Sequence, residues 1–233
     1  MYTDVYKKYV NNFKTILPFI LVKVGIDLLN YFSGSSVKRV EKYDMVFGIG
    51  EIIRNMEIQL IVLGLFLFIS SPIIYAFMAL LCKKILKDEE DINLGETLRE
   101  STHYYFRYIG LSIIIIVIMI GISLFMILTG GMFLLIIPIV LFLLYFAITV
   151  EPCTEYLVYS DSSVEEAFSG GRKIGKKYFW EIVGLNIITT LISLVFKSSF
   201  FLNMPGLLIV SFITAIIQGY VIMFRMNLCT LEN

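Results

Sequence analysis

The feature that most constrains this chain is the length of its stretches without a charged residue. Four stretches lack Asp, Glu, Lys and Arg altogether: Ile58–Cys82, Tyr108–Val150, Ile182–Phe196 and Ser198–Phe224. A helix needs about 20 mostly apolar residues to cross roughly 30 Å of hydrocarbon in a bilayer. Hydrophobic residues make up 58% of the chain and charged residues 16%, an apolar excess that a water-soluble fold has no room to bury. The sequence therefore predicts an all-α, polytopic integral membrane protein.

Six transmembrane helices account for these stretches. The stretch from Tyr108 to Val150 is long enough for two spans, and Gly130-Gly131 supplies the turn between them, because glycine accepts backbone angles that other residues resist. A further span lies near the start, where Lys23 and Asp27 interrupt an apolar segment that lacks the cleavage site of a signal peptide. The predicted spans are 13–33, 58–82, 108–128, 132–150, 179–197 and 205–225, within a single integral membrane domain of residues 1–233.

The basic residues predict a multi-pass protein of the cell membrane with both termini in the cytoplasm. Short loops rich in Lys and Arg stay on the cytoplasmic side, and six spans place both termini on one side. With the termini inside, 13 of the 19 basic residues fall on the inner side and 5 on the outer side. Cys82, Cys153 and Cys229 fall at predicted inner ends of spans, as expected of free thiols in a reducing compartment.

The chain reads as three similar units, each with a short polar and aromatic segment before an outward and a returning span. The segments are 4–12, 93–107 and 163–177. The second and third begin with a cap residue and a Glu three residues later, Asn93 with Glu96 and Ser163 with Glu166, a pattern typical of helix starts. We predict amphipathic helices on the inner leaflet, whose basic residues meet anionic lipid heads; in the third unit these are Arg172, Lys173, Lys176 and Lys177.

The third unit also carries a family resemblance. Ser163-Val164-Glu165-Glu166-Ala167-Phe168, Gly171-Arg172-Lys173-Ile174 and Tyr178-Phe179-Trp180-Glu181-Ile182 are similar to a segment of uncharacterised six-span prokaryotic integral membrane proteins. Those proteins resemble the membrane domain appended to some glycerophosphodiester phosphodiesterases. The resemblance implies a membrane protein without phosphodiesterase activity, because in that family the chemistry belongs to a separate soluble barrel domain.

A second resemblance involves the same segment. The run from Glu165 to Gly171 is similar to the Glu-Ala-Ala…Gly loop of ABC importer permeases, which forms a coupling helix on an ATPase subunit. The family's Ile-x-Leu-Pro ending is replaced here by Ile182-Val183-Gly184-Leu185. This resemblance implies that Glu166, Gly171 and the basic residues after them contact an ATPase partner.

Lys23 and Asp27, two charged residues within a predicted span, form the most specific candidate site. They are spaced i, i+4, so they share one helix face and can form an ion pair, and pairing lowers the cost of charge inside a bilayer. Two interpretations stay open: a polar track for an ion or a lipid headgroup, and a structural pair against a neighbouring helix. Glu151 before Pro152 is interpreted as a solvated helix end, with an ion pair to a Lys or Arg of a surface helix as the alternative. Asn186, Gln218 and Arg225 are interpreted as packing contacts between spans.

No pattern in the sequence indicates an enzyme. His103 is alone, and the cysteines lack zinc-ligand spacing, so we expect no catalytic residues, no metal and no cofactor. The formal net charge of zero gives no reason to expect a nucleic-acid partner. The leading hypothesis is a non-enzymatic membrane protein that handles lipids or assists another membrane component, and the alternative is a permease subunit coupled through residues 163–177.

Overall fold

The computed structural model describes residues 2–41, 58–89, 91–128, 133–200 and 204–232, and every element in these ranges is a helix. This confirms the all-α prediction for the described part of the chain. In chain order the helices are α1 (Tyr2–Asn11), α2 (Phe13–Glu41), α4 (Ile58–Leu86), α5 (Leu94–His103), α6 (Tyr105–Leu128), α7 (Phe133–Val150), α8 (Cys153–Tyr159), α9 (Val164–Lys177), α10 (Phe179–Phe200) and α11 (Met204–Thr230).

Several of these helices are long and apolar enough to cross a membrane. Four such segments occur in the described residues: Ile69–Leu86, Tyr105–Phe125, Ile137–Tyr159 and Pro205–Thr230. A fifth is obtained if α9 and α10, which meet at an angle of 82°, count as one broken crossing. The chain thus has the helices of a multi-pass membrane protein. The predicted spans 13–33 and 179–197 lie within α2 and α10, and residue 132 of the fourth predicted span lies outside the described residues.

The three-unit organisation recurs in the helices. Each unit starts with a short helix, α1, α5 or α9, and a single residue separates it from a long helix, α2, α6 or α10. The separating residues are Asn12, Tyr104 and Tyr178. The returning helices are α4, then α7 with α8, then α11. The sequence pattern of a polar segment before two spans therefore corresponds to one repeated arrangement of helices.

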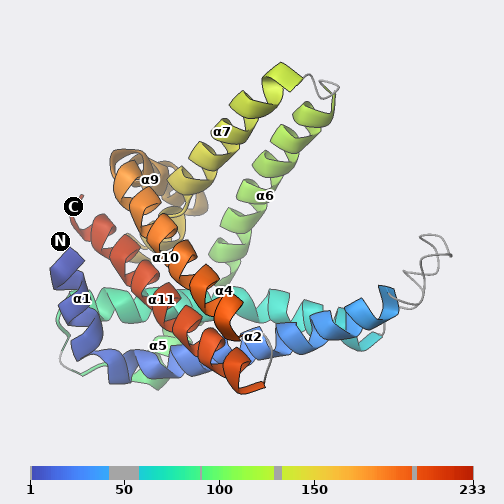
Figure 1. Cartoon of the computed structure of the whole chain (residues 1–233). Coiled ribbons are helices and arrows are strands. Elements are labelled where there is room, and N and C mark those ends of the chain that lie inside the picture. The colour runs from blue at the N-terminus through green and yellow to red at the C-terminus, as the bar shows by residue number, and fades with distance from the viewer. Residues whose placement is uncertain (1, 42–57, 90, 129–132, 201–203, 233) are drawn as a thin grey trace.

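Each short helix packs on the returning helix of another unit. Helix α5 packs on α4, α9 packs on α7 and α8, and α1 packs on α11. The contact between α1 and α11 brings the two ends of the chain together, as Figure 1 shows. The packing sides are stripes at helical spacing, such as Val5 and Tyr9 on α1 or Ala167, Gly171 and Ile174 on α9. The units thus close a ring in which every short helix joins two units.

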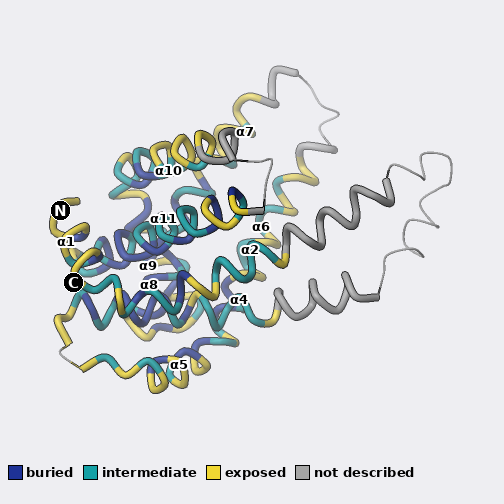
Figure 2. Tube along the Cα trace, turned by 60° about the horizontal axis from the view of Figure 1, so that its bottom comes forward, coloured by how far each residue is buried: buried dark blue, intermediate teal, exposed yellow. Residues whose placement is uncertain are grey.

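Two glycines allow α9 to approach its neighbours closely. A Cβ atom on Gly171 would lie 2.4 Å from Cys153 Cα, and one on Gly175 would lie 2.2 Å from the carbonyl oxygen of Thr149. These separations exclude any side chain without movement of the backbone. The buried residues, dark blue in Figure 2, concentrate where α8, α9 and α11 meet, whereas residues 137–145 of α7 are mostly exposed.

A polar groove as candidate functional site

The largest cluster of charged side chains inside the helical bundle centres on Arg225 of α11, among the residues that the structure describes. Arg225 Nη1 lies 3.2 Å from Glu151 Oε2, and Arg225 Nε lies 3.0 Å from Glu155 Oε1. The side chain of Glu155 is 3% exposed and that of Arg225 is 16% exposed. Asn186 Nδ2 of α10 donates a hydrogen bond of 2.8 Å to Glu151 Oε1. Two carboxyl groups therefore share one guanidinium.

The break between α7 and α8 places these carboxylates. Glu151 and Pro152 form the turn where α7 ends and α8 begins, because the residue before a proline avoids the helical region. Tyr108 of α6 donates to the Thr154 carbonyl oxygen at 3.1 Å, and Thr154 Oγ1 donates to Glu155 Oε2 at 2.7 Å. Helix α6 thus contacts α8, α10 contacts the turn and α11 contacts both, which fixes the directions of the two carboxyl groups.

The sequence interpretation of Glu151 as a solvated helix end is wrong. Its two carboxylate oxygens bind Arg225 and Asn186 from two other helices. Its partner arginine comes from a long apolar helix rather than from a surface helix. Arg225 was expected to act as a packing contact, and it also pairs with both Glu151 and Glu155. Spacing could not reveal this, because 74 residues separate Glu151 from Arg225.

A cavity of about 400 Å³ lies between α10 and α11, and Arg225 is one of the residues that line it. We call this cavity the polar groove. Asn186, Thr190 and Ser193 line it from α10 at spacings of four and three residues, which place them on one helix face. Thr214, Gln218 and Arg225 line it from α11 on one face in the same way. The remaining lining residues are Tyr75, Thr189, Leu194, Ile217, Val221 and Ile222.

Two features make the polar groove more than a packing defect. Gln218 Oε1 is buried and accepts no hydrogen bond, a costly state for an amide oxygen away from water. A second cavity of about 260 Å³, lined by Tyr108, Ser112 and Glu155, shares Tyr75, Ile222 and Arg225 with the groove. Arg225 therefore stands between two cavities that both contain polar side chains.

In helix α9, the predicted coupling helix, the motif residues Glu166 and Gly171 make contacts within the chain. The Ser163 backbone N–H donates to Glu166 Oε2 at 3.0 Å, and the Glu166 N–H donates to Ser163 Oγ at 3.4 Å. This confirms the capping box predicted at 163–166, and these hydrogen bonds lower the pKa of Glu166 below its ordinary value. Gly171 is buried against Cys153. At the start of α5, Asn93 accepts hydrogen bonds from the N–H groups of Gly95 and Glu96.

The basic residues of α9 divide into two groups. The Arg172 guanidinium lies over the Phe146 ring, 5.4 Å from its centroid, and Lys177 forms an ion pair with Glu232 near the C-terminus. Lys177 nevertheless stays exposed, as do Lys173 and Lys176, whereas Arg172 is half-buried. The hydrogen bond with Glu232 raises the pKa of Lys177. Only part of the predicted basic surface is therefore directed away from the protein.

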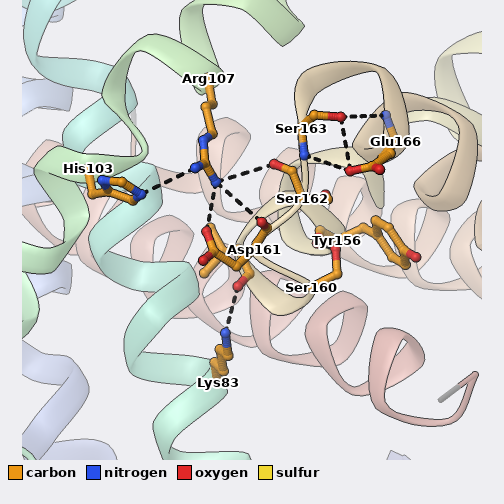
Figure 3. Close-up of polar contacts among 10 residues, drawn as sticks. Lys83, His103, Arg107, Tyr156, Ser160, Asp161, Ser162, Ser163 and Glu166 are labelled. Carbon is orange, nitrogen blue, oxygen red and sulfur yellow. Dashed lines mark hydrogen bonds and ion pairs between the residues drawn. The ribbon is translucent and has the colours of Figure 1, made fainter.

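The loop between α8 and α9 is held by residues from α4 and α6 (Figure 3). Arg107 Nη1 donates to Asp161 Oδ1 at 2.7 Å and also lies 3.4 Å from the carbonyl oxygen of Ser162. Lys83 Nζ donates to the Val158 carbonyl oxygen at 2.8 Å. Partial burial alone would raise the pKa of Asp161, but the hydrogen bond and charge of Arg107 lower it. The sequence carries no signal for this contact, because the partners are 54 residues apart.

The predicted ion pair between Lys23 and Asp27 is present. Lys23 Nζ lies 3.1 Å from Asp27 Oδ1, with side-chain exposures of 15% and 25%. Neither residue is among those that line the polar groove. The pair and the groove are therefore separate features, and the two interpretations of the pair stay open.

Comparisons of the chain with protein-family models, curated proteins and solved structures found no match. The resemblance to the membrane domain of glycerophosphodiester phosphodiesterases therefore stays a prediction, and the functional argument is built on the site alone.

Proposed function

We propose that this chain is a six-span protein of the cell membrane that binds the headgroup of a phospholipid in the polar groove. The observation that carries the proposal is the pair of facing polar stripes on α10 and α11, which end at Arg225. Polar side chains within membrane helices are costly and usually face a partner or a polar cavity. A lipid headgroup is a polar partner that is abundant beside such a groove.

The surroundings of the groove suit an amphiphilic ligand. Thr190 and Leu194 line the groove and are also exposed, so the groove opens at the side of the bundle. On the same helix Ile187 and Leu191 are 54% and 57% exposed. Apolar side chains beside a polar opening allow a headgroup to enter while its acyl chains stay along the outer surface of α10.

The proposed orientation has both termini in the cytoplasm and α1, α5 and α9 on the inner leaflet. Its support is the 82° turn between α9 and α10 and the aromatic residues at such turns. Trp180 is 77% exposed at the start of α10, and Phe106 is 80% exposed at the start of α6. Aromatic rings favour the headgroup level of a bilayer. In this orientation, Lys173 and Lys176 reach anionic lipids of the inner leaflet.

A permease role with an ATPase subunit on α9 is the competing hypothesis. It requires Glu166 and Gly171 to be available to a partner, but Glu166 caps α9 and Gly171 packs on α8. The geometry therefore favours lipid handling, a non-enzymatic role. Stoichiometric co-purification of an ATPase with the full chain would reverse this preference.

The test is the amount of phospholipid that remains on the purified full-length protein. We expect bound lipid, quantified by mass spectrometry after purification in mild detergent, to fall when Ser193→Leu and Thr214→Leu are combined. These changes remove two hydroxyls from the groove and narrow it. The matched control is Ser123→Leu on an exposed position of α6, which should leave the lipid content unchanged. An equal lipid content in all three proteins would contradict the proposal.

A further inference from the structure

We infer that the polar groove selects a hydroxyl-bearing headgroup, whose hydroxyls bind between the Gln218 amide and the Arg225 guanidinium. Both residues line the groove from α11. The inference rests on the proposed function for its lipid form, in which the hydroxyls belong to the terminal glycerol of phosphatidylglycerol. The same hydroxyls are present in soluble glycerol phosphate, and the experiment below distinguishes the two sources.

The first argument is that two groups in the groove require opposite kinds of partner. Gln218 Oε1 is buried, and no described residue donates a hydrogen bond to it. The Arg225 guanidinium has five N–H donors. Its contacts with Glu151 and Glu155 involve Nη1 and Nε, and Nη2 donates no hydrogen bond to a described residue. The groove therefore presents a hydrogen-bond acceptor at Gln218 and hydrogen-bond donors at Arg225.

The second argument is the placement of these two groups. Gln218 comes seven residues before Arg225 on α11, so both lie on one helix face, two turns or about 10 Å apart along the axis. Long side chains on a helix lean toward its N-terminus, so the Arg225 side chain points along α11 in the direction of Gln218. A diol offers two adjacent hydroxyls for this space, one beside each group.

The third argument compares the headgroups chemically. A hydroxyl both donates and accepts hydrogen bonds, so it can donate to the Gln218 amide oxygen and accept from the Arg225 guanidinium. A primary ammonium donates but cannot accept from Arg225. An ionised phosphodiester accepts but cannot donate to Gln218, and a quaternary choline group does neither. Of these groups, the hydroxyl alone is a partner for both residues.

The fourth argument concerns the walls of the groove. Thr189 Oγ1 donates to the Asn186 carbonyl oxygen at 3.1 Å, a local hydrogen bond common for hydroxyls in helices. Thr190, Ser193 and Thr214 also line the groove, but their hydroxyls form no hydrogen bond with another described residue. These three hydroxyls are therefore able to bind the remaining oxygen atoms of the same headgroup.

The test compares headgroups on the delipidated full-length protein in detergent, with affinities measured by native mass spectrometry. The matched pair is phosphatidylglycerol and phosphatidylethanol, which carry the same single negative charge and differ in the two hydroxyls. Phosphatidylethanolamine supplies the ammonium headgroup, and glycerol phosphate supplies the soluble form of the hydroxyl-bearing one. We expect phosphatidylglycerol to bind about tenfold more tightly than the other two lipids, a preference that two hydrogen bonds of ordinary net strength account for.

The variants remove the amide that only a donor can satisfy. Gln218→Leu should weaken phosphatidylglycerol binding by about two- to tenfold, the loss expected for one hydrogen bond, and leave phosphatidylethanol binding unchanged. Gln218→Met, which is closer to glutamine in length, replaces it if the leucine variant fails to fold. Ser123→Leu on an exposed position of α6 serves as the control variant, and gel filtration reports the fold of each protein.

The outcomes separate the two proposals. Phosphatidylglycerol that binds no more tightly than phosphatidylethanol or phosphatidylethanolamine would overturn the hydroxyl inference while leaving lipid binding intact. Glycerol phosphate that binds as tightly as phosphatidylglycerol would support the hydroxyl site and refute the lipid-headgroup role. The absence of binding by any lipid and by glycerol phosphate would refute both proposals.

Discussion

The α6–α7 hairpin and the α10–α11 pair are both formed by consecutive apolar helices, yet their inner surfaces differ. Among the described residues, those that line the cavity of about 380 Å³ between α6 and α7 are all apolar or glycine: Gly121, Ile122, Phe125, Pro138, Ile139 and Phe142. Of the twelve described residues that line the groove between α10 and α11, eight carry a hydroxyl, amide or charged group. In an 18-residue window of the segment Tyr105–Phe125 of α6, 11% of residues are buried, against 39% in a window of the same length in the segment Pro205–Thr230 of α11.

This difference separates two properties of a membrane helix. Apolar composition allows a helix to enter a bilayer, but it gives little reason to associate with another helix, because lipid tails are equally apolar. Polar groups and close packing at small residues supply that reason. The α6–α7 hairpin has the first property, and Figure 1 shows it projecting from the other helices. The α10–α11 pair and its base at α8 and α9 have both.

The largest expected effect is the removal of Arg225. Arg225→Leu leaves Glu151 and Glu155 close together without their shared partner, and breaking a buried ion pair costs about 3–5 kcal/mol. The measurement is the unfolding free energy of the purified protein in detergent. Adding Glu151→Gln and Glu155→Gln should recover much of the loss. If the single variant were no less stable than the wild type, the cluster would not hold α8 and α11 together.

The second largest effect is expected from an alanine substitution at a closely packed glycine, compared with the same substitution at an open one. Gly175→Ala places a Cβ atom 2.2 Å from the carbonyl oxygen of Thr149, whereas Gly121→Ala on α6 meets no atom within 4 Å. We expect the first change to cost about 1–3 kcal/mol through overpacking. The second should be neutral or stabilising by up to about 1 kcal/mol, because alanine is the better helix former. Equal unfolding midpoints for both variants would contradict the difference in packing.

A smaller effect comes from single hydrogen bonds. Tyr108→Phe removes the hydrogen bond to the Thr154 carbonyl oxygen at the base of the cluster, with an expected loss of about 0.5–1.5 kcal/mol. Ser123→Ala removes a hydrogen bond to the Met119 carbonyl oxygen on the exposed side of α6, with a change within about 0.5 kcal/mol. Chemical denaturation of the two variants in parallel measures both values, and a larger loss at Ser123 would reverse the comparison.

The smallest effect is the pH dependence of the contact between Arg107 and Asp161, which joins the base of the hairpin to the α8–α9 loop. Because the folded-state pKa of Asp161 is lowered from 3.8, its contribution is complete above the pKa of the unfolded state. The contribution is lost as the pH falls through the folded-state pKa. We expect Asp161→Asn to cost about 0.2–1 kcal/mol near neutral pH, since the pair is exposed.

Comparison of the wild type with Asp161→Asn isolates this carboxyl from the others. Their difference in unfolding free energy should shrink toward zero as the solution is acidified below the ordinary pKa of aspartate. A difference that stays constant with pH would show that the hydrogen bonds of Asp161, rather than its negative charge, hold the loop.

Local patterns in the sequence predicted several elements because their causes are local. The charge-free stretches gave the positions of the long helices, since apolarity over about 20 residues is a property of one segment. The Ser163–Glu166 capping box and the Lys23–Asp27 pair involve residues three and four positions apart, and helix geometry alone brings such residues together. The three-unit organisation was visible for the same reason, as a repeated order of polar and apolar segments.

The candidate site required the tertiary structure. Glu151, Asn186 and Arg225 come from three separate parts of the chain, and each alone has an ordinary explanation as a helix end or a packing contact. Gly171, predicted to face a partner, instead allows α9 to approach α8. Sequence by itself therefore determined a helical membrane protein built from repeated units. Only the packing of helices far apart in the sequence decided which polar residues share a cavity. Such contacts join separate segments, so they produce no periodic pattern within any one segment.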